Sequence, residues 1–168
     1  MVVLGLDPAN KFGFAIGSAG KIMKFGMQDV AKQATQMRCQ NVTACYGWLR
    51  KLIKEHNVTV VCAEDAAAAF SGVHTLKSHA RYAGIIDLVC EQLGMERIES
   101  VHPTKLKAWA AGSGAAKKEQ MVRAARMLYG IDVKDEDAAD AVHVCAWAMN
   151  ELKVAEVKKR ALESKAPW

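Results

Sequence analysis

The sequence predicts an α/β fold in which helices cover both faces of a mixed β-sheet. Three observations support this prediction. The chain opens with a short apolar strand pattern followed by a hairpin pattern. Residues 58–63 are apolar on both faces, as in a central strand covered by helices, and helical periodicity dominates the rest of the chain. The length of 168 residues is close to that of one domain, so we expect a single domain over residues 1–168.

The first strand is predicted at residues 2–6, an apolar run that ends at Asp7 and is followed by turn residues. Residues 12–17 and 21–27 are predicted to pair as a hairpin. Between residues 30 and 56 the apolar side chains recur at helical spacing. The side chains expected on the buried stripe of this helix are Met37, Cys45, Trp48, Leu49, Leu52 and Ile53.

The part of the chain after residue 63 is predicted to be mostly helical. In order, we expect a helix over residues 76–93, a weaker strand over 96–101, a short helix from Pro103, a helix over 117–129, and a long helix from Asp135 that reaches as far as Lys165. Pro103 suits the first turn of a helix and Gly130 suits a C-cap. The core is expected to include Ile85, Ile86, Leu88, Val89, Leu93, Trp48, Trp109 and Trp147.

Composition excludes several classes of protein. Hydrophobic residues make up 51% of the chain and charged residues 24%, which argues against a disordered, collagen-like or coiled-coil chain. The apolar run at residues 2–6 is too short for the core of a signal peptide, and no run of about eighteen apolar residues exists. Five cysteines without a C-x-x-C pair indicate buried, reduced thiols rather than a zinc site. We therefore expect a cytoplasmic protein with no membrane partner and no organic cofactor.

The net charge leaves a nucleic-acid partner open. Lysine and arginine number 23, against 18 aspartates and glutamates, and the sequence pI is about 9.0. This basic excess permits binding to nucleic acid or to another anionic surface but does not require it.

Two acidic residues follow apolar strands. Asp7 ends the first strand and Glu64 follows the strand at 58–63. Functional groups in open α/β sheets gather beyond the carboxyl ends of the strands, so the two side chains can meet there. For Asp7 the alternative is an ordinary turn residue; Glu64 has no comparable role in turns.

A third acidic group lies at the start of the last helix. The macrodipole explains acids in a first turn, such as Asp135 and Glu136. It explains Asp140 poorly, because Asp140 lies one turn further on among alanine and valine. Asp137 and Asp140 are three residues apart and therefore share a helix face.

If Asp7, Glu64, Asp137 and Asp140 converge, their mutual repulsion requires protons or cations between them. Two like charges about 4 Å apart repel by about 4 kcal/mol at an effective dielectric constant of 20. Oxygen-only ligands select hard ions such as Mg²⁺ or Mn²⁺. A pair of such ions, about 4 Å apart, can activate a water and stabilise the leaving oxygen in phosphodiester cleavage.

Three short motifs, in this order, resemble the RuvC-type Holliday-junction resolvases of the ribonuclease H-like superfamily. They are Gly5-Leu6-Asp7-Pro8, Ala63-Glu64 and Asp137-Ala138-Ala139-Asp140-Ala141, and the resemblance runs from Val2 to about Trp147. It implies a five-stranded mixed sheet, a homodimer with two active sites, and paired nicks in a four-way DNA junction that leave 5′-phosphate and 3′-hydroxyl ends. The four carboxylates would then be the ligands of two Mg²⁺ ions, with Mn²⁺ as a substitute.

The resemblance also implies roles for basic and aromatic residues. By position, Lys107 and Lys118 match lysines that support cleavage and hold the DNA backbone, and Lys118 would act in catalysis. Other candidates for DNA binding, which needs cations near the acids, are Lys105, Lys117, Lys77 and Arg81. The alternative for any of these is a solvated helix face.

Two residues depart from the family pattern. RuvC-type enzymes often carry an aromatic residue a few positions after the glutamate, and here alanines intervene before Phe70. Phe70 is a candidate to stack on an unpaired base or, equally, to anchor its own loop. His143 is a candidate metal ligand or, more commonly for a lone histidine on such a helix, a structural side chain.

The sequence thus predicts a metal-dependent, structure-selective DNA endonuclease that acts on branched DNA. The alternative is a non-catalytic protein that binds branched DNA on the same fold; four intact acids argue against it, since they would repel phosphate. A phosphotransferase with the related actin-like fold ranks last, because that fold normally needs two such domains.

Overall fold

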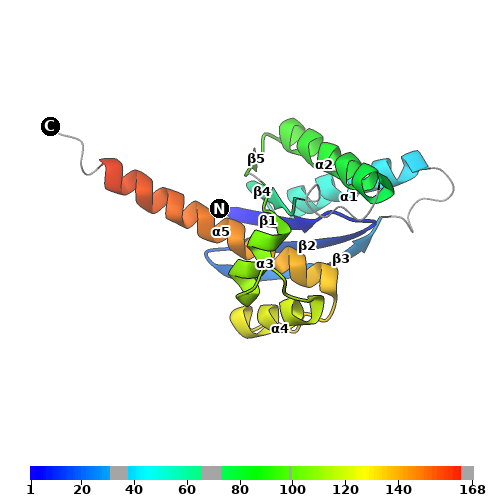
Figure 1. Cartoon of the computed structure of the whole chain (residues 1–168). Helices are drawn as coiled ribbons and strands as arrows, with labels where there is room; N and C mark the ends of the chain where they lie inside the picture. Colours follow the sequence, from blue (N-terminus) through cyan, green and yellow to red (C-terminus); the bar gives the residue numbers. More distant parts are fainter. Residues whose placement is uncertain (31–37, 66–72, 99, 164–168) are drawn as a thin grey trace.

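The computed structural model describes residues 1–30, 38–65, 73–98 and 100–163. Its sheet has the strand order β3-β2-β1-β4-β5 (Figure 1). The strands are β1 (Val2–Asp7), β2 (Lys11–Ser18), β3 (Lys21–Asp29), β4 (Val60–Ala63) and β5 (Glu96–Arg97). The first three strands pair antiparallel, whereas β4 is parallel to both β1 and β5. The predicted mixed five-stranded sheet is therefore present.

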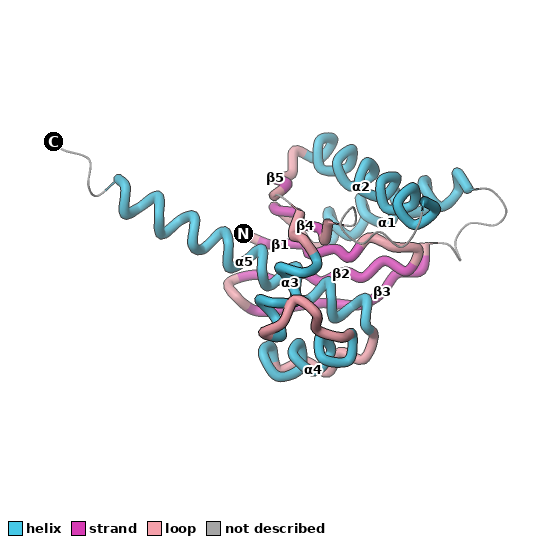
Figure 2. The backbone as a smooth tube through the Cα atoms, viewed as in Figure 1, coloured by secondary structure: helices cyan, strands magenta, loops and turns pink. Residues whose placement is uncertain are grey.

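Helices cover both faces of this sheet (Figure 2). On one face lie α1 (Arg38–Glu55) and α2 (Val73–Leu93). On the other lie α3 (Pro103–Ala111), α4 (Lys118–Tyr129) and α5 (Glu136–Glu163). Alternation along β1 explains the two cores, because Leu4 and Leu6 pack with α1 and α2, whereas Val3 packs with α5.

The register of β1 and β4 positions the acidic residues. Leu6 pairs with Ala63, and the backbone N–H of Glu64 donates to the carbonyl oxygen of Leu6 at 2.9 Å. The two parallel strands therefore end side by side, with Asp7 at the end of one and Glu64 just after the other.

Two predicted core residues are wrong. Leu88 is 45% exposed because Ile85, Ile86 and Val89 already occupy the inward side of α2. Trp109 is 41% exposed because α3 turns Leu106 and Ala110 inward instead. The last predicted strand is also shorter than expected: β5 has two residues, and Val101 forms only an isolated bridge with Glu64.

The predicted burial of the cysteine thiols is confirmed. Of the five cysteines, the four whose side chains the structure describes are buried free thiols: Cys45, Cys62, Cys90 and Cys145. The end of α5 extends beyond the sheet (Figure 1), and its residues 153–160 are exposed. The described ranges contain no helix that is both long and apolar enough to cross a membrane.

Candidate active site

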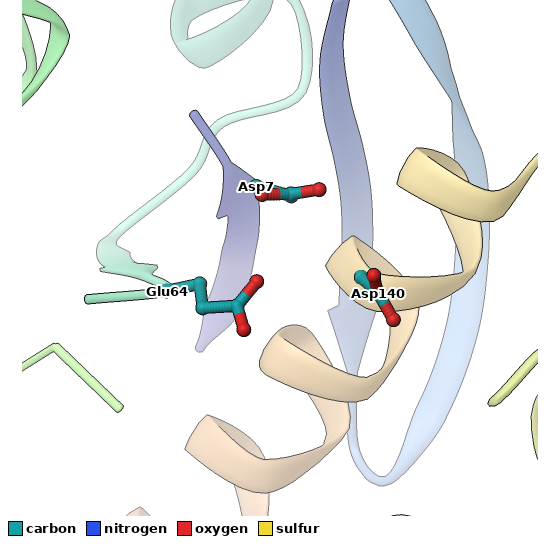
Figure 3. A group of neighbouring side chains, drawn as sticks. All are labelled: Asp7, Glu64 and Asp140. Carbon is teal, nitrogen blue, oxygen red and sulfur yellow. The ribbon is translucent and has the colours of Figure 1, made fainter. Parts of the chain in front are cut away.

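Three carboxylates converge at the carboxyl ends of β1 and β4. Asp7, Glu64 and Asp140 each offer an oxygen, and these oxygens all lie within 4.8 Å of one another. Figure 3 shows the three side chains, which come from β1, the end of β4 and α5. They line a cavity of about 260 Å³ that opens at this edge of the sheet. The structure thus brings together three of the four acids that the sequence singled out.

The start of α5 places Asp140 in this cavity. Asp135 caps the helix, because its Oδ1 accepts a hydrogen bond from the backbone N–H of Ala138 at 2.9 Å. Ala138, Ala139 and Ala141 are buried against the sheet. These small side chains let the first turns of α5 lie close to β1, with Asp140 facing the ends of the strands.

Burial and mutual repulsion make the carboxylates reluctant to ionise. Burial, followed by the charges of Glu64, Asp140 and Asp137, raises the pKa of Asp7 well above its usual value. Burial, followed by the charge of Asp140, raises the pKa of Glu64 to about 7. The pKa of Asp140 is raised to about 6, mainly by burial. Metal-free protein therefore carries an electrostatic cost here that a bound cation would relieve.

The donor set fits a hard divalent cation. The Oδ1 atom of Asp140 is buried and has no hydrogen-bond partner, although buried polar atoms are normally satisfied. All three ligand atoms are carboxylate oxygens, which suit Mg²⁺ or Mn²⁺ and not the softer metals. An unsatisfied oxygen among oxygen ligands fits a site that can hold a cation.

Asp137 lies beside the cluster, at the rim of the same cavity. Its Oδ1 is 3.6 Å from the Nζ of Lys118, which is also 3.3 Å from Oε2 of Glu136. Burial pulls the pKa of Lys118 down, but the hydrogen bond to Glu136 and the charge of Asp137 outweigh it and raise the pKa overall. Lys118 therefore keeps its positive charge. Its partner is Glu136, an acid that the sequence analysis explained only by the helix macrodipole.

The lysines of α3 and α4 divide into two groups. Lys107 and Lys118 line the cavity, and both charges lower the pKa of Glu64 and Asp140 against the effect of burial. Lys105 lies over the ring of Trp147, with Nζ 5.1 Å from the ring centroid. Lys117 is the exposed N-cap residue of α4. The structure brings only Lys107 and Lys118 to the carboxylates.

Two other predicted DNA contacts, Lys77 and Arg81, do not line the cavity. Both are exposed on α2. Phe70 lies outside the described residues. The roles of these three residues stay predictions.

His143 does not face the cluster. Its Nε2 lies 2.9 Å from the carbonyl oxygen of Met121, and its Nδ1 lies 3.2 Å from the hydroxyl of Tyr129. A carbonyl only accepts, so Nε2 donates and Nδ1 accepts from Tyr129. With both nitrogens engaged and the side chain fully buried, His143 has neither nitrogen free for a metal; we assign it the structural role.

His79 of α2 also lines the cavity; in the sequence it belongs with Lys77 and Arg81 to a basic group expected near this edge. Its ring hydrogen-bonds to the backbone of Pro8, whose only polar backbone group is the carbonyl, so the ring donates. No sequence signal identifies this contact, because it depends on how closely α2 approaches the turn after β1.

Comparison with known proteins places this geometry in a family. The model of the family "Crossover junction endodeoxyribonuclease RuvC" matches residues 3–147. The chain belongs to the RuvC family. Its curated relatives include RuvC of Campylobacter lari, 29% identical over 92% of this chain and 99% of the relative, and RuvC of Moorella thermoacetica, 26% identical over the same shares.

Solved structures agree on the fold. Thermus thermophilus RuvC in complex with a Holliday junction substrate matches with a TM-score of 0.73 and 17% identity, over 87% of this chain and 91% of that one. The yeast mitochondrial Holliday junction resolvase Ydc2 matches with a TM-score of 0.61 and 14% identity, over 86% and 75%. The predicted ribonuclease H-like fold, family and enzyme class are confirmed.

Proposed function

We propose that this RuvC-family chain is a metal-dependent endonuclease that resolves four-way DNA junctions by paired nicks, leaving 5′-phosphate and 3′-hydroxyl ends. The observation that carries the proposal is the half-buried group of Asp7, Glu64 and Asp140, in which the Oδ1 atom of Asp140 is buried and unsatisfied. The names of the relatives, crossover junction endodeoxyribonucleases, support the substrate class. Residues 1–168 would act as one catalytic domain.

The metal would be Mg²⁺, with Mn²⁺ as a substitute, and we propose two ions per site. Asp7, Glu64 and Asp140 would hold them, with Asp137 as a further ligand at the rim. When bound, the ions supply an activated water and stabilise the charge that develops on the phosphate.

Placement of the phosphate and further stabilisation of charge depend on side chains of this chain. The carboxylates fix where the scissile phosphate can enter, since like charges exclude it unless cations are present. Lys118, held by Glu136 and Asp137, places a permanent positive charge at the cavity rim. Lys107 adds a second charge from α3. Such preorganised charges stabilise a transition state more than a ground state when they point to where charge develops.

Lys107→Gln is expected to slow nicking of a bound junction by about 10²-fold, the usual cost of losing one charge-stabilising group. Lys105→Gln serves as the matched control on the same helix, because Lys105 lies over Trp147 and not in the cavity. It is expected to weaken junction binding without slowing the nicking step. Single-turnover rates at saturating protein separate the two effects, and equal rates for both variants would contradict the assignment of Lys107.

Paired nicks require two sites, so we propose that the chain acts as a homodimer. One surface suits such contact: Gly84 and Leu88 are exposed on α2, and a Cβ at Gly84 would meet no atom within 4 Å. Gly84→Glu is therefore expected to leave the fold intact, to halve the mass found by sedimentation, and to uncouple the two nicks. A dimer of unchanged stability would place the interface elsewhere.

The test of the proposed function is a cleavage assay on synthetic four-way junctions, flaps, forks and linear duplex, with Mg²⁺, with Mn²⁺ or with EDTA. We expect metal-dependent, symmetric nicks in the four-way junction, with ligatable ends. Binding without nicking under all metal conditions would favour the alternative, a non-catalytic protein that binds branched DNA.

A further inference from the structure

Two glycines of the sheet lie directly beneath the first turns of α5. A Cβ on Gly13 of β2 would stand 2.0 Å from the carbonyl oxygen of Asp137 and 2.5 Å from its carbonyl carbon. A Cβ on Gly5 of β1 would stand 2.3 Å from the backbone nitrogen of Cys145 and 2.6 Å from the carbonyl oxygen of Ala141. All of these are backbone atoms of α5, so they cannot move unless the helix moves.

The place of Gly13 in the sheet ties this contact to the carboxylates. In the antiparallel register of β1 and β2, Gly13 pairs with Asp7. The same residue therefore pairs with the strand segment that holds Asp7 and supports the helical turn from which Asp137 and Asp140 project. Gly5 supports the next turn, just after Asp140.

We propose that Gly13, assisted by Gly5, is a positioning residue that sets the depth of α5 on the sheet and thereby the spacing between Asp140 and the carboxylates of Asp7 and Glu64. The proposal rests on the proposed function, because it concerns the geometry of that metal site. A side chain at Gly13 would have to displace the start of α5 by about 1 Å to bring its Cβ to 3.0 Å from the Asp137 oxygen. A displacement of about 1 Å can cost about 10² in rate.

Gly17 provides a matched control on the same strand. It pairs with Val3, at the opposite end of β1 from Asp7. A Cβ there would meet the terminal Cε of Met149 at 2.7 Å, the carbonyl oxygen of Lys21 at 2.9 Å and the Sγ of Cys145 at 3.0 Å. The substitution therefore disturbs the packing of β2 against α5 and against the backbone of β3, without pressing on the helical turns that carry the acids.

The experiment compares Gly13→Ala, Gly5→Ala and Gly17→Ala in the full chain. Urea unfolding and junction binding in EDTA measure folding, calorimetry with Mn²⁺ measures metal affinity, and junction nicking measures catalysis. For Gly13→Ala we expect a folded protein that binds junctions in EDTA. Its Mn²⁺ affinity should be lower by about 10- to 100-fold, the usual cost of losing a residue that supports metal ligands. Its nicking rate at saturating Mn²⁺ should fall by about 10²-fold. Gly5→Ala should show the same pattern, and Gly17→Ala should lose stability yet keep both Mn²⁺ affinity and rate.

If the wild-type protein binds Mn²⁺ and nicks junctions, any one of three results would overturn the proposal. These are normal Mn²⁺ affinity in Gly13→Ala, an equal loss of affinity in Gly17→Ala, or failure of both Gly13→Ala and Gly5→Ala to fold, since the proposal requires a shifted helix and not a lost one. A wild-type protein that neither binds Mn²⁺ nor nicks junctions would overturn the proposed function and this proposal with it.

Discussion

Asp7→Asn is expected to abolish metal-dependent nicking and to leave junction binding intact. The substitution keeps the size of the side chain but removes the charge that a divalent cation needs from one of three clustered ligands. Because the ligands act as a unit, the loss of one is expected to reduce the rate by about 10³-fold or more. Junction affinity without metal should hold or rise, since one negative charge near the phosphates is gone.

The measurement pairs nicking with Mg²⁺ and a binding assay in EDTA, on the same four-way junction. Asp132→Asn is the matched control: it removes the same charge from an exposed residue that pairs with Lys134 at 3.5 Å on the surface. The control should nick at nearly the wild-type rate. Nicking by Asp7→Asn at more than about a tenth of that rate would remove Asp7 from the metal site and leave the family assignment in place.

The acids at the strand ends were predictable from the sequence for a simple physical reason. An acid at the end of a strand that is apolar on both faces is costly to bury unless a proton or a cation compensates its charge, so its presence there indicates a functional group. Parallel pairing of β1 and β4 then brings Asp7 and Glu64 to one edge. Asp140 was predictable by the same reasoning, as an acid among small apolar neighbours on a helix.

Other parts of the site could not be predicted, because they depend on how far and at what rotation the helices pack. Helical spacing puts His143 on the same side of α5 as Asp140. In the structure, however, both ring nitrogens of His143 hydrogen-bond to α4, one to Met121 and one to Tyr129. Spacing puts Lys105 and Lys107 on different sides of α3 but does not say which side faces the site. Lys105 lies over Trp147, and Lys107 lines the cavity of the carboxylates. The three-dimensional packing of α3 and α4 determines the partners of His143 and of the two lysines.

Glu64→Gln is expected to stabilise the metal-free protein at pH 8 and to have no effect on stability at about pH 4. In the fold the pKa of Glu64 is raised from 4.5 to about 7, first by burial and then by Asp140. Below the unfolded value, both states are protonated and glutamine resembles the acid. Above about pH 7 both states are ionised, and only the folded state bears the cost of the buried charge. The stability that this group contributes is therefore complete at low pH and is lost as the pH rises through 7.

The size of the effect follows from the shift. One pKa unit corresponds to about 1.4 kcal/mol, so the wild-type protein should be less stable than Glu64→Gln by about 3 kcal/mol at pH 8. Urea unfolding in EDTA at intervals between pH 4 and pH 8 measures this difference, and comparing the two proteins at each pH cancels the titration of the buried histidines. Glu91→Gln, an exposed position on α2, is the control and should have the same stability as the wild type at every pH.

Addition of Mn²⁺ at pH 8 should stabilise the wild type more than the Glu64→Gln variant, because the cation offsets the same repulsion that the substitution removes. A glutamine variant less stable than the wild type at pH 8 in EDTA would mean that the charge of Glu64 is compensated within the fold, and the physical case for a cation among these three carboxylates would fail.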